Sequence, residues 1–204
     1  MKKLISVFLA VLLVLSLSLY ALGDENLPNY KWEHVEKIVQ DTFGSNGNVY
    51  QIKNIDASIW LPGEYISVDP VQEGLGPDCL GLFLMGDSFV LINYTDPEGL
   101  DLNSYYDYSI QQGLQVEKVL VNDIPAILQD NPQEDSFLLM FQTQENKFLQ
   151  FIFSPLSNPV NGIIMSSIQS TVAQEPTPVE SSSESTGVSE PAAPTNPVSG
   201  LIYK

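Results

Sequence analysis

The segment Ser136–Ser154, "SFLLMFQTQENKFLQFIFS", decides the fold class of this chain. Two apolar runs flank a polar turn at Glu145-Asn146, a pattern that predicts a β-hairpin. Because both faces of such a hairpin are apolar, its sheet must be covered on both sides. One face is expected to carry Phe137, Leu139, Phe141, Phe148 and Ile152, and the other Leu138, Met140, Leu149, Phe151 and Phe153.

Three helical segments are predicted to supply these covers, because their apolar residues recur at helical spacing. Asp101 or Asn103 is expected to cap the second helix, and the side chains expected to face inward are Leu102, Tyr105 or Tyr106, and Ile110. We therefore expect an α+β fold, with one mostly antiparallel sheet covered by helices on both faces. The three predicted helices span about residues 29–43, 101–113 and 158–172.

The segment "VLVNDIPAILQDN", Val119–Asn131, interrupts an apolar run with the polar pair Asn122-Asp123. Asn and Asp tolerate positive φ, so the pair predicts a hairpin turn whose side chains are replaceable, although a ligand-binding pair is the alternative. Pro125 lacks an N–H, and its side of the returning strand should lie at an edge or a bulge. Gly86-Asp87 predicts another two-residue hairpin turn.

Both termini differ from the domain that they flank. Residues 1–23 combine two lysines, an apolar run and small residues at Ala21 and Gly23, which predicts a secretory signal peptide cleaved between Gly23 and Asp24. An uncleaved membrane anchor is the alternative, because the apolar run is long enough to span a bilayer. Residues 24–172 form the predicted domain. Residues 173–204 are a low-complexity tail rich in Pro, Ser, Thr and Glu, and are predicted to be disordered.

The charge balance excludes several classes of partner. The chain has eight lysines, no arginine and 25 Asp and Glu, which gives a formal net charge of −17. Nucleic-acid binding requires clustered positive charge, and the chain has none. Contact with a membrane is expected only through an uncleaved N-terminal segment. The acidity itself serves solubility or attracts a basic partner.

No catalytic, cofactor-binding or metal-ligating residue is predicted. His34 is the only histidine and lies on the expected exposed side of the first helix, and Cys79 is the only cysteine, which excludes a disulfide within the chain. The cluster Asp96, Glu98, Asp101 and Asn103 could bind Ca²⁺, but a turn followed by a helix cap explains the same residues. A secreted hydrolase that uses carboxylates remains an alternative function.

The order of elements resembles that of a known family of exported proteins. The resemblance rests on the segments "SIWLPGEY" at 58–65, "IPAILQ" at 124–129 after a turn that opens with Asn, the long hairpin, and "MSSIQ" at 165–169. Over roughly residues 55–170, this order resembles the PsbP-like and DcrB-like sandwich family. The resemblance implies an extracytoplasmic, non-catalytic binding or assembly module, whose ligand is an unknown protein or small molecule.

Overall fold

The computed structural model describes residues 27–52 and 55–170, which form three helices and eleven strands. The helices are α2 (Trp32–Phe43), α3 (Leu102–Gln111) and α4 (Asn161–Ser166). The strands are β1 (Asn29–Tyr30), β2 (Gly47–Gln51), β3 (Ala57–Pro62), β4 (Ile66–Val68), β5 (Cys79–Met85), β6 (Ser88–Thr95), β7 (Gln115–Val121), β8 (Ile124–Asn131), β9 (Ser136–Gln142), β10 (Phe148–Ser154) and β11 (Gln169–Ser170).

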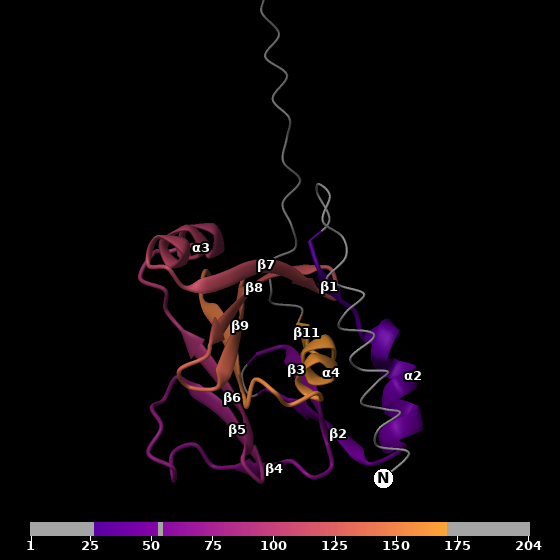
Figure 1. Ribbon diagram of the computed structural model, residues 1–204. Coiled ribbons are helices and arrows are strands. Elements are labelled where there is room, and N and C mark those ends of the chain that lie inside the picture. Colours follow the sequence, from indigo (N-terminus) through magenta and orange to yellow (C-terminus); the bar gives the residue numbers. More distant parts are fainter. Residues whose placement is uncertain (1–26, 53–54, 171–204) are drawn as a thin grey trace, which may run out of the picture.

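Eight strands form one curved sheet in the order β1-β7-β8-β9-β10-β6-β5-β4. β1 pairs in parallel with β7, and the remaining neighbours are antiparallel. Figure 1 shows β7 and β8 running across one end of the steeper strands β5, β6, β9 and β10. The sheet therefore has a concave inner face and a convex outer face.

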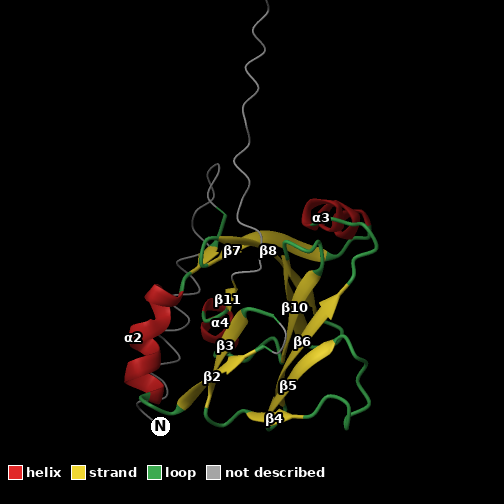
Figure 2. Ribbon diagram, turned by 180° about the vertical axis from the view of Figure 1, so that it is seen from behind, coloured by secondary structure: helices red, strands yellow, loops and turns green. Residues whose placement is uncertain are grey.

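A second sheet of three strands, in the order β11-β3-β2, covers the inner face together with α4 (Figure 2). Alternate residues of β3 point into the core, where Ile59 and Leu61 are fully buried. They meet the aromatic residues of the β9–β10 hairpin, including Phe151. α2 lies outside this layer and packs through Val35 and Val39 against Ile163 of α4.

The predicted α+β sandwich with helices on both faces is wrong. Strands make up most of the secondary structure of the described residues, and the inner face is covered mainly by a second sheet. On the outer face, α3 lies mainly over β7 and β8. Its Tyr105 ring packs edge-on against Phe148, with 5.8 Å between ring centroids.

The predicted division of the hairpin faces is also wrong, because the β9–β10 register differs from the expected one by one residue. Phe141 pairs with Leu149, and Thr143 bonds to Lys147 across a three-residue loop. Side chains alternate along strands, so one extra loop residue exchanges the faces of one strand relative to the other. The inner face carries Phe137, Leu139, Phe141, Leu149, Phe151 and Phe153, and the outer face Leu138, Met140, Phe148 and Ile152.

The helix predictions are confirmed in type and corrected in extent. α2 begins at Trp32, because Asn29 and Tyr30 pair with β7 instead of extending the helix. The predicted third helix is confined to α4, and the chain then joins β3 as β11. In α3, Ile110 is half exposed at 50%, so its predicted inward orientation is wrong, whereas Tyr105 does face the sheet.

The two predicted two-residue hairpin turns are confirmed. Gly86 has φ 55° between the paired residues Met85 and Ser88. Asn122 and Asp123 have φ values of 49° and 69° and join β7 to β8. Pairing of β8 with β9 starts only at Ile127, so Pro125 lies where β8 has no partner on that side, as its missing N–H requires.

Candidate functional site

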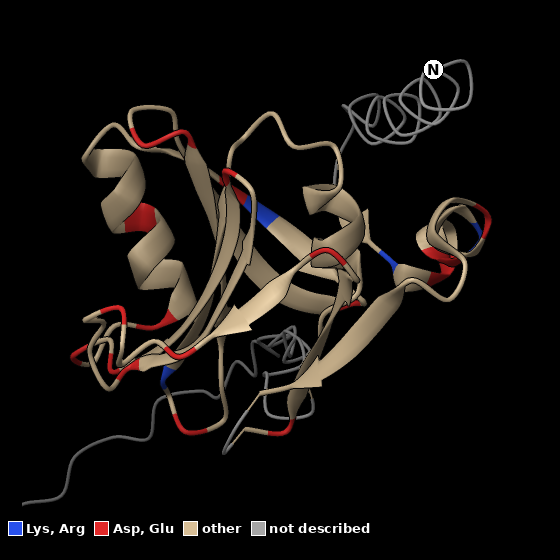
Figure 3. Ribbon diagram, turned by 90° about the horizontal axis from the view of Figure 1, so that it is seen from below, with Lys and Arg blue, Asp and Glu red and all other residues tan. Residues whose placement is uncertain are grey.

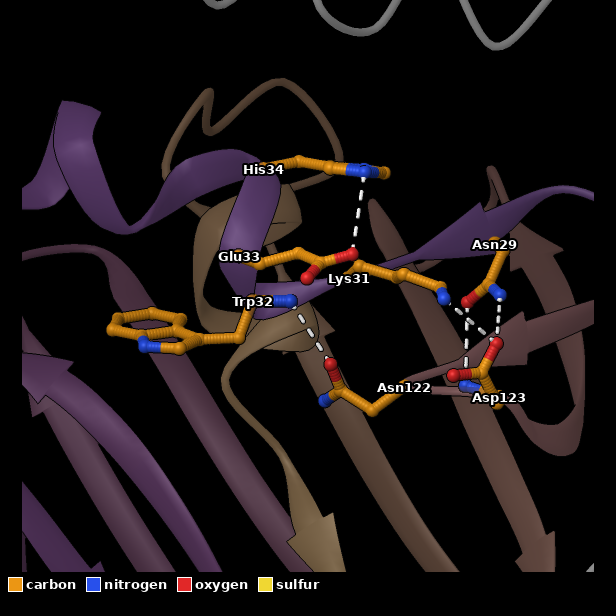
Figure 4. A network of polar contacts seen from close by, with 7 residues as sticks. All are labelled: Asn29, Lys31, Trp32, Glu33, His34, Asn122 and Asp123. Carbon is orange, nitrogen blue, oxygen red and sulfur yellow. Dashed lines mark hydrogen bonds and ion pairs between the residues drawn. The ribbon is translucent and has the colours of Figure 1, made fainter.

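The side chain of Asn122 joins three segments that are distant in sequence (Figure 4). Its Oδ1 accepts a hydrogen bond of 2.9 Å from the backbone N–H of Trp32, the first residue of α2. Its Nδ2 donates to the carbonyl oxygens of Ser166 and Ile168 at 2.9 and 2.8 Å. Both N–H donors and the oxygen of this half-buried amide thus have partners within the protein, which argues against the alternative of a ligand-binding pair.

Asp123, the second residue of the turn, makes its contacts on the solvent-exposed side. Its Oδ1 accepts from Asn29 Nδ2 at 2.7 Å and lies 3.0 Å from the ammonium nitrogen of Lys31. The hydrogen bond from Lys31, followed by that from Asn29, lowers the pKa of the Asp123 carboxyl. Because the Asp123 side chain is 68% exposed, this contact is screened by water and contributes little to stability. The Asn122-Asp123 turn and its partners therefore form a structural clamp, which is centred on Asn122.

The sole histidine and the sole cysteine do not meet. His34 is exposed on α2, where its Nε2 lies 3.7 Å from Glu33 Oε1. Cys79 begins β5, in the large sheet, and burial raises the pKa of its thiol, which makes the thiolate scarcer. A Cys-His nucleophilic pair is thus not assembled.

The acidic residues that precede α3 form a turn and a helix cap. Asp96 accepts a hydrogen bond from the backbone N–H of Glu98, as in an Asx turn. Asp101 caps α3 by accepting from Ser104 N–H at 2.7 Å, and this bond lowers the pKa of the Asp101 carboxyl. Asn103 instead accepts from Lys118 at 2.8 Å. Across residues 27–52 and 55–170, no group of three or more His, Cys, Asp or Glu side chains is placed to hold a metal ion.

One shallow pocket of about 250 Å³ lies at the far end of the β7–β8 hairpin, lined by Gln115, Val116, Glu117, Leu128 and Asp130. Glu117 and Asp130 are diagonal neighbours on the inner face, since Glu117 pairs with Leu128 and Gln115 with Asp130. Glu117 is exposed as a residue, but partial burial of its carboxyl, and then the charge of Asp130, raises the pKa of that carboxyl. Burial and the same two carboxylates raise the pKa of Tyr30 to about 12. No sequence motif marks this pair, because its members are 13 residues apart and come together only through the hairpin register.

Apolar side chains form two cross-strand rows on the outer face of the large sheet, which we call the outer ladder. They are Ile66, Leu84 and Phe89 in one row, and Val68, Leu82, Leu91, Ile152 and Leu138 in the other. The rows become more exposed toward β4, with Leu84 at 36% and Ile66 at 68%. α3 lies over β7 and β8, away from this end. The apolar residues are evident in the sequence, but their exposure is not, because it depends on where the helices pack.

Charge is distributed unevenly around these features. Figure 3 shows Asp and Glu over many loops and only scattered Lys. Between residues 54 and 117 the chain has no Lys, Arg or His. The strands β4, β5 and β6, at the β4 end of the large sheet, all belong to this stretch. The strands that carry the exposed part of the outer ladder therefore have no basic residue of their own.

Comparison with known proteins assigns no family, because no family model matches the chain and no curated protein matches its sequence. The resemblance to the PsbP-like and DcrB-like family accordingly stays a prediction. The predicted cleavage between Gly23 and Asp24 and the tail at 173–204 lie outside the described residues. Within the described part of the chain, no helix is long and apolar enough to cross a membrane.

Proposed function

We propose that this chain is an exported, non-catalytic binding or assembly module that presents the outer ladder to a protein partner. The observation that carries the proposal is the exposure of large apolar side chains at one end of an otherwise well-packed sheet, with Ile66 and Leu84 facing each other across β4 and β5. Contiguous apolar surface of this kind is characteristic of interaction sites. The sequence of residues 1–23 supports export.

Site-specific photo-crosslinking in the organism that makes the protein tests this function. A photoreactive phenylalanine derivative at Leu84 is expected to give a discrete protein adduct in the extracytoplasmic fraction. The matched control is the same derivative at Val49, which is 63% exposed on β2 of the small sheet. No adduct at position 84 above the level at position 49 would contradict the proposal.

A second function, hydrolysis by carboxylates, is favoured by the pocket that holds Glu117 and Asp130. A carboxyl whose pKa is raised by burial is suited to act as a general acid. Chromogenic glycoside and ester substrates, assayed with the parent and the Glu117→Gln variant, test this candidate. Turnover that Glu117→Gln abolishes would establish it, and turnover that survives the substitution would assign the activity elsewhere.

A further inference from the structure

The strand β4 ends the large sheet and has a free outer edge. It pairs with β5 through Ile66, Ser67 and Val68, and in the part of the chain that the structure describes no strand pairs with its other side. Edge strands expose unpaired backbone groups, and proteins protect them by keeping the strand short or with Lys, Pro or inward-pointing charges. β4 is short, with 3 residues, but it carries no Lys, Pro or charge, and its Ile66 and Ser67 are exposed.

Carboxylates bracket both ends of this edge. Glu64 precedes β4, and Asp87 lies in the turn that follows the β5 residues paired with the start of β4. At the other end, Asp69 follows β4 and Asp78 precedes β5. All four are exposed. The edge therefore combines an apolar strand surface with negative charge and with no cation between residues 54 and 117.

The negative charge determines whether the β4 edge favours a second copy of this chain or a strand of another protein. A second copy of the chain would bring the same carboxylates against these, and the formal net charge of −17 adds to the repulsion. A strand that carries Lys or Arg meets complementary charge instead, which favours both encounter and register. The acidic bracket thus disfavours self-pairing and leaves the edge open to a basic strand.

We propose that the β4 edge binds an extended segment of a partner protein in which apolar and basic residues alternate. The segment would add a ninth strand to the sheet and form backbone hydrogen bonds with β4. Because side chains alternate along a strand, its apolar residues would extend the outer ladder beside Ile66 and Val68. Its basic residues would point to the side of Ser67, within reach of the bracketing carboxylates. This inference rests on the proposed binding function and specifies its surface and its partner.

Fluorescence anisotropy of the purified protein tests the proposal with a labelled heptapeptide of alternating lysine and valine as the probe. The same peptide with a central proline keeps the charge but cannot continue strand pairing. The test uses two matched variants. Ile66→Lys places a charge on the β4 edge, whereas Val49→Lys makes the same change at a similarly exposed strand residue, with exposures of 68% and 63%. Both substitutions change the net charge equally, so they separate the edge from overall attraction.

At an ionic strength of about 0.15 M, Ile66→Lys is expected to weaken binding at least about tenfold and Val49→Lys by less than about twofold. The proline peptide should bind at least about tenfold more weakly than the probe. Hydrogen exchange of the parent should show new protection, when the probe is added, of those Ile66–Val68 amides that do not already bond to β5. Equal binding of both peptides, equal effects of both variants, or absent protection on β4 would each overturn the proposal.

The anisotropy experiment tests strand addition at β4, and the crosslinking experiment tests the proposed function, so their failures can be told apart. An adduct at Leu84 without binding of the probe to β4 would overturn strand addition and leave the proposed function standing. If neither the adduct nor binding of the probe is observed, both the proposed function and strand addition are overturned.

Discussion

Replacing Asn122 by glycine is expected to destabilise the protein strongly, although glycine is the residue best suited to the turn. Glycine adopts the φ of 49° at this position without steric cost, so the backbone of the hairpin is preserved. What is lost is the amide that binds Trp32, Ser166 and Ile168. The substitution therefore isolates the contribution of the side chain.

The magnitude follows from three lost hydrogen bonds, each with a net value of about 0.5–1.5 kcal/mol. After allowance for relief of the positive φ, Asn122→Gly is expected to lower the free energy of unfolding by about 2–3 kcal/mol. For a domain of this length, that corresponds to a fall in melting temperature of about 6–12 °C. Urea unfolding and thermal melts followed by circular dichroism measure both quantities.

The neighbouring turn residue provides the matched control. Asp123 also has positive φ, at 69°, but its side chain is 68% exposed and its ion pair with Lys31 is screened. Asp123→Gly makes the unfolded chain as flexible as Asn122→Gly does, so this effect cancels between the two variants. Asp123→Gly is expected to melt within about 2 °C of the parent. Equal melting temperatures for the two variants would refute the clamp.

The remaining predictions concern the core, the pocket and the termini. Leu139→Ala, at a fully buried position, should lower the free energy of unfolding by about 2–5 kcal/mol in urea titrations, and a loss below about 1 kcal/mol would contradict the packing described. Glu117→Gln should stabilise the protein slightly at pH 7, by well under about 1 kcal/mol, because Glu117 is exposed and water screens its repulsion with Asp130. The pKa of Glu117 is raised in the folded state, so ionising this carboxyl destabilises the protein. This cost is absent below the ordinary Glu pKa of about 4.3 and grows as pH rises toward the folded-state pKa. The gain from Glu117→Gln should therefore vanish in melts at about pH 4. Deleting residues 174–204 should change the melting temperature by less than about 5 °C, and a larger fall would mean that this segment docks on the domain. Mass spectrometry of the protein from its native source should give Asp24 as the first residue, whereas a chain that retains Met1 or Lys2 would contradict cleavage.

Features set by neighbouring residues were predictable from the sequence. The Asp101 cap, the Gly86-Asp87 turn and the Asn122-Asp123 turn all depend on backbone conformations that a few adjacent residues determine. The existence of the β9–β10 hairpin followed from its apolar composition in the same way.

The fold class was missed because it depends on one residue of register and on packing between distant layers. A two-residue turn at Glu145-Asn146 and the observed loop, in which Asn146 has φ 57°, fit the same letters. Only the second places six buried apolar residues together on the inner face of the hairpin, which meets a second sheet. Likewise, the apolar spacing of residues 158–172 suits a helix, but the end of this segment pairs with β3 as β11. Pairing with a strand about 110 residues earlier leaves no local trace.

Asn122 shows the same limit at the scale of one side chain. The sequence around it correctly indicates a residue with positive φ, and a plain turn would leave its side chain replaceable. Its amide instead binds groups 44, 46 and 90 residues away, in α4, in the segment that leads to β11 and in α2. Glycine and asparagine are both acceptable to the turn, and only asparagine also satisfies these backbone groups. The choice between them is therefore made by tertiary structure, and a turn motif by itself cannot distinguish a spacer from a clamp.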